Sequence, residues 1–294
     1  MEMRHIRYFL MLAEEKSFTR AAARIGIGQP PLSMQIRDLE NEIGYPLFNR
    51  TAQGVQLTEA GRAFLQEIKP VTTLASDAIA SARRAAMGET GILRLGFTGT
   101  AGLNPVIPAC IRDFGQAFPA VHMNVTEANS LALIDSLLQN QLDIAFIREE
   151  SSLPAGIDSH RVLQEPLVAA LPLAHPLAKA RGKVELAALQ HDNFILTPQE
   201  TGTSLRGAAI LACRKVGFEP PEGQPAPHIV SILSVVAAGL GVSLVPESMR
   251  QLALSGVVFK HLKSPPPMIG LAAAWNASAF SAPASNFLAL VKML

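Results

Sequence analysis

Two short helical patterns joined by a very short connection constrain the start of the chain more than any other feature. Residues 18–25 carry apolar side chains on one helical face, with Ser17 placed to cap the first turn and Gly26 placed to end the helix. A second pattern begins at Gln29, with prolines in its first turn, where a missing N–H is tolerated. This spacing predicts a helix-turn-helix over about residues 18–37.

A further helical pattern precedes this pair, and a small hairpin follows it. Apolar side chains recur at helical spacing over residues 3–13. Residues 47–50 and 55–57 have strand character and flank a turn that contains Gly54. We therefore expect residues 1–58 to form a helical domain that ends in a wing.

The second helix of the pair is expected to have a polar face that can contact DNA in a groove. Its apolar side chains recur at helical spacing, so they define the inward side and leave the opposite side polar. That side and the hairpin present groups able to contact base edges, thymine methyl groups or phosphates. The candidate DNA-binding residues are Gln29, Pro30, Pro31, Ser33, Met34, Arg37, Arg50 and Gln53. The alternative is the solvated face of an ordinary helical domain.

Charge supports a nucleic-acid partner through its arrangement, because the formal net charge is only +1. No acidic side chain occurs between Lys16 and Arg37, a stretch that also holds Arg20 and Arg24. Since the field at the contact face controls the approach to phosphate, this stretch favours DNA.

Residues 59–88 predict one long helix that pairs two copies of the chain. Its apolar positions average about 3.5 residues apart, which is typical of a coiled-coil seam. The seam comprises Phe64, Ile68, Val71, Ala75, Ala78, Ala82 and Ala85. An ordinary amphipathic core helix is the alternative, and Pro70 should kink the helix.

From residue 91 onward, apolar strand-like runs alternate with helical patterns, which predicts an α/β domain with mostly parallel sheets covered on both faces. Strands are expected over residues 92–97, 121–126, 142–147, 167–171, 194–196, 242–245, 257–261 and 269–275, and helices over 105–118, 130–138, 203–216, 229–238 and 284–294. The glycines at 96, 99 and 102 are each three residues apart, which does not match the dinucleotide fingerprint G-x-G-x-x-G. The amides and hydroxyls of the turn at residues 98–102 can hold a carboxylate, or the threonines can simply cap the turn.

No motif in the sequence predicts catalysis or a metal site. G-x-S-x-G, H-E-x-x-H, Walker A and C-x-x-C patterns are absent. Cys110 and Cys213 lie far apart in apolar helical patterns, as expected in a reducing compartment. The start lacks a secretory pattern, and glycines or prolines interrupt both uncharged stretches, residues 229–246 and 264–291. A cytoplasmic protein without a membrane span is expected.

Residues 1–65 resemble the winged helix-turn-helix of LysR-type transcriptional regulators. The resemblance is carried by residues 4–9, 17–22, 29–33, 39–40, 44, 46–48, 50 and 54–61. The opening and the paired prolines resemble the branch that controls aromatic-acid and muconate catabolism. Many relatives carry Arg where this chain has Met34 and a basic residue where it has Gln53, which implies weaker DNA binding with a shallower salt dependence.

Residues 91–294 resemble the effector domain of the same family, which has two lobes shaped like type 2 periplasmic binding proteins. The resemblance is carried by residues 93–96, 142–146, 175–177 and 236–246. It implies a ligand crevice between two α/β subdomains, with effector-binding residues Thr98, Thr100, Ser130, Arg148, Thr201 and Thr203. The guanidinium of Arg148 suits a carboxylate, although a surface ion pair with a neighbouring acid such as Glu149 is the alternative. His228 is expected to be a structural histidine.

The resemblance implies a sequence-specific DNA-binding transcriptional regulator, an activator whose bending of promoter DNA responds to a small-molecule inducer. The expected inducer is a carboxylic acid such as an aromatic acid or a muconate-like diacid, and no other cofactor or metal is expected. The implied partners are double-stranded promoter DNA, further copies of the chain and RNA polymerase. The copies would dimerise through the linker helix and assemble into a homotetramer.

Two other functions remain open at this point. An enzyme or a solute-binding protein can use the α/β domain alone, but the helix-turn-helix opposes that reading. An architectural DNA-binding protein needs no inducer, but the large two-lobed carboxyl-terminal part opposes it.

Overall fold

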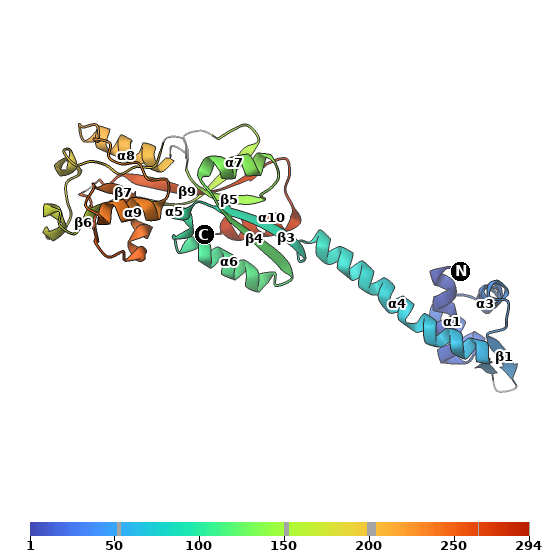
Figure 1. Cartoon of the computed structure of the whole chain (residues 1–294). Coiled ribbons are helices and arrows are strands. Elements are labelled where there is room, and N and C mark those ends of the chain that lie inside the picture. Colours follow the sequence, from blue (N-terminus) through green and yellow to red (C-terminus); the bar gives the residue numbers. More distant parts are fainter. Residues whose placement is uncertain (52–53, 150–152, 199–203, 264, 294) are drawn as a thin grey trace. The chain divides into compact units, whose positions relative to one another are not determined.

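The computed structural model describes residues 1–51, 54–149, 153–198, 204–263 and 265–293. The chain forms two compact units, Met1–Arg84 and Ala85–Leu294 (Figure 1). We refer to them as the amino-terminal unit and the effector unit.

The amino-terminal unit is a three-helix assembly with a two-stranded hairpin and a long final helix. Its elements are α1 (Met3–Glu15), α2 (Phe18–Ile25), α3 (Gln29–Ile43), β1 (Phe48–Thr51), β2 (Gly54–Leu57) and α4 (Glu59–Ala86). The side chains of Phe9, Leu12, Leu32 and Leu39 are fully buried and join the first three helices in one core. The helix-turn-helix and the wing expected from the sequence are confirmed.

Local chemistry explains the tight connections in this unit. The Ser17 side chain accepts a hydrogen bond from the backbone N–H of Arg20 and caps α2. Gly26 ends that helix at φ 83°, a left-handed conformation that glycine adopts without steric cost. Gly61 allows α4 to begin against the hairpin, because a Cβ there would lie 2.1 Å from the carbonyl oxygen of Leu47.

The helix α4 continues through Pro70 without a break. Its first half belongs to the core of the unit, with Ile68 buried. Farther along, Leu74 and Ile79 are 65% and 56% exposed, so the second half presents apolar surface to solvent. Pairing of two copies along the seam expected from the sequence stays a prediction.

The effector unit has a mixed sheet flanked by helices. Its strands are β3 (Gly91–Phe97), β4 (Val121–Glu127), β5 (Ile144–Arg148), β6 (Ile157–Pro172), β7 (Ser243–Pro246), β8 (Val257–His261) and β9 (Met268–Asn276). Its α-helices are α5 (Gly99–Gly102), α6 (Val106–Ala117), α7 (Ser130–Leu138), α8 (Ser204–Lys215), α9 (Ile229–Ala237) and α10 (Ala282–Val291), and short 3-10 helices include η1 (Pro176–Lys179), η2 (Leu186–Leu189) and η4 (Glu247–Leu252).

The expectation of mostly parallel sheets is wrong. The strand order is β4-β3-β5-β9-β6-β7, with β8 also paired to β6. Among the strands of the described residues, β3 pairs parallel with β4 and β5, whereas β6 and β9 pair antiparallel to each of their neighbours. Residues 194–196 do not form the expected strand, because Phe194 makes isolated bridges to Glu222 and Val242 instead of a continuous ladder.

Strand β6 joins the two lobes of this unit, as Figure 1 shows. Its residues 157–166 pair with β9, and residues 167–172 pair with β7 and β8. Separate buried clusters form on the two sides, one around Phe114, Phe146 and Phe287 and the other around Phe194 and Leu244. The two-lobed fold is therefore confirmed, and residues 165–167 of β6 lie at the passage between the lobes.

Candidate functional site

The residues proposed for DNA contact lie on the outer side of the amino-terminal unit. Gln29, Pro30 and Pro31 form the exposed start of α3, Met34 is 58% exposed, and Ser33 is half-buried. Arg37 and Arg50 are exposed as well. Gln53 lies outside the described residues. The periodicity therefore identified an outward face on α3, as DNA contact requires.

Two of these side chains are held by neighbours. The hydroxyl of Thr19 donates to Oε1 of Gln29 at 3.1 Å, which leaves the amide NH₂ directed elsewhere. The guanidinium carbon of Arg50 lies 5.3 Å from the ring centre of Phe18, in cation–π range. Arg37 has no ion-pair partner among the residues that the structure describes, so its guanidinium is available for phosphate or guanine.

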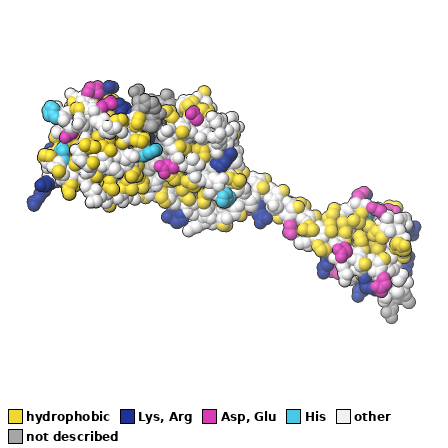
Figure 2. Space-filling model, viewed as in Figure 1, with side chains coloured by type: hydrophobic (Ala, Val, Ile, Leu, Met, Phe, Trp, Pro, Cys, Tyr) yellow, Lys and Arg dark blue, Asp and Glu magenta, His cyan; other side chains and the backbone are white. Residues whose placement is uncertain are grey.

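The acid-free stretch is less basic in three dimensions than in sequence. Arg24 contacts the carboxylates of Glu14 and Glu15, each at 2.7 Å, and Arg20 approaches Glu15 at 3.4 Å. The left-handed conformation of Lys16 turns the chain between α1 and α2, which brings these groups together. The hydrogen bond from Arg24 lowers the pKa of the Glu15 carboxyl. Figure 2 shows acidic and basic side chains interspersed on the visible face of this unit, so only part of the stretch can attract phosphate.

A cavity of about 200 Å³ lies in the effector unit between the lobes. It is lined on the first lobe by Thr98, Gly99, Thr100, Glu127, Ala128, Asn129, Ser130 and Arg148, and on the second by Thr197, Leu205, Pro227, His228, Ile229 and Ile232. Hydroxyls and charged groups therefore gather on the first lobe, and most of the second wall is apolar.

Hydroxyl groups face this cavity with hydrogens available to a ligand. Oγ1 of Thr98 accepts from the backbone N–H of Ala101 at 3.3 Å and lies 3.3 Å from Oγ1 of Thr100. Oγ1 of Thr100 in turn accepts from Nε of Arg148 at 3.0 Å. Only one of the two threonine hydroxyls can donate to the other, so the second can donate to a ligand. The side chain of Ser130 is 4% exposed, and its hydroxyl has no hydrogen-bond partner within the described part of the chain.

The side chain of Arg148 is buried and already paired. It is 1% exposed, its Nη1 donates to Oε1 of Glu165 at 2.8 Å, and its Nη2 donates to the carbonyl oxygen of Thr100 at 2.9 Å. A surface ion pair with Glu149 is therefore wrong: β5 is an interior strand, and Glu149 bonds Arg161 instead. Burial lowers the pKa of Arg148, and Glu165 opposes that shift.

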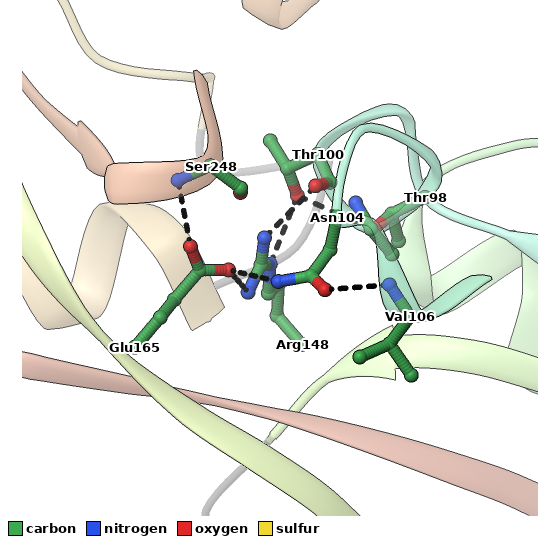
Figure 3. Close-up of polar contacts among 8 residues, drawn as sticks. Thr98, Thr100, Asn104, Val106, Arg148, Glu165 and Ser248 are labelled. Carbon is green, nitrogen blue, oxygen red and sulfur yellow. Dashed lines mark hydrogen bonds and ion pairs between the residues drawn. The ribbon is translucent and has the colours of Figure 1, made fainter. Parts of the chain in front are cut away.

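Glu165 connects the lobes beside the cavity (Figure 3). Its Oε1 accepts from Arg148 and, at 3.3 Å, from Nδ2 of Asn104, both on the first lobe. Its Oε2 accepts from the backbone N–H of Ser248 on η4 of the second lobe at 2.8 Å. Since Glu165 lies where β6 passes between the lobes, one carboxylate ties the cavity wall to both sides of the crossing.

Two family models match the chain. The one described as "Bacterial regulatory helix-turn-helix protein, lysR family" matches residues 3–62, and the one described as "LysR substrate binding domain" matches residues 86–293. The chain belongs to the LysR family of bacterial transcriptional regulators. Members of this family are DNA-binding regulators and not enzymes, and the matches cover both halves of the chain.

Full-length relatives support this membership. The chain is 35% identical over 288 residues to the HTH-type transcriptional regulator BudR of Raoultella terrigena, covering 98% of this chain and 99% of BudR. It is 32% identical over 292 residues to the Hca operon transcriptional activator HcaR of Escherichia coli (strain K12), covering 99% and 97%. Among solved structures, the LysR family transcriptional regulator CbnR has a TM-score of 0.84 at 25% identity, covering 99% of this chain and 100% of that chain.

The site of this LysR-family regulator contains some of the expected effector residues and others that the sequence reasoning missed. Thr98, Thr100, Ser130 and Arg148 line one cavity. Thr201 and Thr203 lie outside the described residues. The further lining residues include Glu127, Asn129 and His228, and Glu165 holds the cavity wall through Arg148. Glu165 could have been recognised from the sequence, because it is a single acidic residue directly before the apolar run that forms the second half of β6.

His228 lines the cavity at the start of α9, and its expected structural role stays a prediction. No helix in the described residues is long and apolar enough to cross a membrane. Nor do the described residues group His, Cys, Asp or Glu side chains in a way that could hold a metal ion.

Proposed function

We propose that this LysR-family regulator binds a small organic acid between the lobes of its effector unit, and that this binding changes its action on promoter DNA. One observation supports the proposal above the others. The cavity presents the hydroxyls of Thr100 and Ser130, and Thr100 is bonded directly to the buried Arg148–Glu165 pair at the passage between the lobes.

The cavity suits a molecule of modest size. A dry apolar cavity of about 150 Å³ can hold benzene. The present space of about 200 Å³ therefore accommodates a single-ring or short-chain acid. The hydroxyls and the first-turn amides of α9 supply donors for carboxylate oxygens. An aromatic acid or a muconate-like diacid remains the effector class favoured by the paired prolines of the amino-terminal unit.

The contacts suggest how a bound acid changes the protein. A carboxylate oxygen of the ligand can accept a hydrogen bond from the Thr100 hydroxyl. That hydroxyl already accepts a hydrogen bond from Nε of Arg148, so the ligand is linked to Arg148 through Thr100. Arg148 shares Glu165 with the backbone of Ser248 on the other lobe. The acid can shift the lobes only as far as it prefers one arrangement over the other. A coupling of about 1–3 kcal/mol changes DNA affinity roughly 5–150-fold.

The DNA-bound assembly is part of the same proposal. We place α3 in the major groove, with Gln29, Ser33 and Arg37 toward the bases and backbone. Two copies would pair along the exposed face of α4, and two such dimers would form a tetramer that bends the promoter. The name of HcaR as an operon activator supports activation as the direction of control.

Titration calorimetry tests the effector proposal directly. Benzoate, cis,cis-muconate and other small carboxylates are titrated into the wild type, Ser130→Ala and Ser136→Ala, the last being a matched control on the same helix outside the cavity. We expect Ser130→Ala to weaken binding of the active acid about fivefold, because a neutral hydrogen bond contributes about 1 kcal/mol. Ser136→Ala should bind like the wild type. Failure of every acid to bind, or an acid that leaves the DNA footprint unchanged, contradicts the proposal.

A further inference from the structure

The carboxylate of Glu127 is a cavity-lining group that the proposed function has not yet used. Glu127 is the last residue of β4, the edge strand of the sheet, and its side chain is exposed. It makes no hydrogen bond or ion pair with any other residue that the structure describes. Its Oε1 lies close over the turn, since a Cβ at Gly99 would be 2.7 Å from that oxygen. Glycine at position 99 therefore allows the carboxylate to approach the cavity wall.

Within the described residues, the cavity lacks the unpaired positive charge that a diacid would need. Arg148 is the lining guanidinium, and Glu165 already neutralises it at 2.8 Å. Glu127 adds a negative charge with no cation against it in the described residues, and His228 is the titratable group on the facing wall. A dicarboxylate would bring further negative charge beside Glu127, and like charges at close range repel.

We propose that Glu127 selects effectors that carry an ammonium group beside the carboxylate, namely apolar α-amino acids or related zwitterions. This inference rests on the proposed effector site, and it replaces the muconate-like diacid with a zwitterion as the favoured ligand. The ammonium group bonds the Glu127 carboxylate at the first lobe. The apolar side chain packs on Leu205, Ile229 and Ile232 of the second lobe.

Donors on both lobes remain for the carboxylate of such a ligand. Ser130 is a buried residue whose hydroxyl has no partner within the described residues, and it lines the same cavity as Glu127. The side chain of His228 does not cap α9, so the first-turn amides of that helix are open to an anion. A zwitterion thus finds its anionic and cationic partners in one cavity.

Paired ligands isolate the contribution of the ammonium group. Calorimetry at neutral pH compares L-valine, L-leucine, L-isoleucine and L-phenylalanine with the same acids lacking the amino group, and with adipate and cis,cis-muconate. The proteins are the wild type, Glu127→Gln and Glu89→Gln, all as the full chain. Glu89 is an exposed acid outside the cavity and serves as the matched control.

We expect the wild type to bind at least one amino acid about fivefold or more tightly than its deaminated partner and than either diacid. Glu127→Gln should lose that preference, and Glu89→Gln should keep it. The inference is overturned if Glu127→Gln retains the preference, or if the diacids or deaminated acids bind as tightly as the amino acids. In either case the proposed function stands. If no acid or amino acid binds the wild type, both proposals fail.

Discussion

The two units place their charged side chains in opposite environments. In the amino-terminal unit, Arg24 and Glu14 meet on the surface, where their side chains are 51% and 60% exposed. In the effector unit, the side chains of Arg148 and Glu165 are only 2% and 9% exposed. Exposed pairs contribute little to stability, whereas removing one partner of a buried pair leaves an uncompensated charge. The candidate DNA contacts of the first unit are therefore set among exposed charges, whereas the candidate effector site of the second lies beside a buried ion pair.

The largest expected effect follows from breaking the buried pair. Glu165→Ala or Arg148→Ala should lower the free energy of unfolding by about 3–5 kcal/mol, because the remaining charge is buried without a partner. Urea denaturation of the full chain, followed by circular dichroism, measures the loss. Arg24→Ala is the control in the amino-terminal unit and should leave the transition nearly unchanged.

The double variant Arg148→Met with Glu165→Leu sharpens this result. Removing both charges at once replaces the pair with apolar side chains, so much of the lost stability should return. Equal losses of unfolding free energy for Arg24→Ala and Glu165→Ala would contradict the difference between exposed and buried ion pairs.

Alkaline pH should destabilise the effector unit selectively, since both cysteines of the chain lie in it. Burial raises the pKa of Cys110 to about 11 and that of Cys213 to about 12. The folded state holds these protons more tightly, so this stability is present below about pH 9 and falls as pH rises toward the folded pKa values. At pH 10 each thiol should reduce the unfolding free energy by about 1.4 kcal/mol.

Denaturation at pH 8 and pH 10 provides the measurement. Each of the variants Cys110→Ala and Cys213→Ala is compared with itself at the two pH values. The loss of unfolding free energy between pH 8 and pH 10 should be smaller in each variant than in the wild type. An identical drop in all three proteins would mean that the thiols do not titrate as described.

Removing the cap of α2 should lower the free energy of unfolding by less than breaking the buried ion pair. Ser17→Ala removes the acceptor for the Arg20 N–H and should cost about 1 kcal/mol. Ser17→Asn keeps an acceptor at the cap and should retain most of the stability. Thermal unfolding of the amino-terminal unit detects the difference, and a loss as large as that of Glu165→Ala would contradict the ranking.

The smallest effect concerns DNA binding and not folding. Arg37 has no acidic partner among the described residues, so Arg37→Ala should reduce the slope of log K against log salt by about 0.9 per protomer if it contacts a phosphate. Arg24 is already paired with Glu14 and Glu15, and Arg24→Ala should change the slope less. Fluorescence anisotropy with promoter DNA across a salt series compares the two, and equal slopes would remove Arg37 from the interface.

The sequence predicted what depends on local periodicity. The expected helix at 130–138 and strand at 257–261 coincide with α7 and β8, and the helix-turn-helix has the expected turn. The first half of β6 was missed, because polar residues such as Asp158, His160 and Arg161 interrupt its pattern and its partner strand β9 lies far away in sequence.

In the candidate site too, local features were predictable from the sequence and contacts between distant residues were not. Hydroxyls that follow strands were recognisable, and they do line one cavity. The role of Glu165 depends on residues 104, 148 and 248, which only the fold brings together. The pairing of Arg24 with Glu14 was hidden for a similar reason, because the turn at Lys16 reverses the chain.

The shared strand β6 restricts how the lobes can respond to a ligand. Because the single strand β6 pairs with β9 in the first lobe and with β7 and β8 in the second, the lobes are joined here by a paired strand and not by a flexible tether. A bulge between Arg161 and Leu163 concentrates twist just before the passage. The effector signal should thus travel as a small change in the twist of β6, which amide exchange at Glu165 and Leu167 would register before any change in overall dimensions.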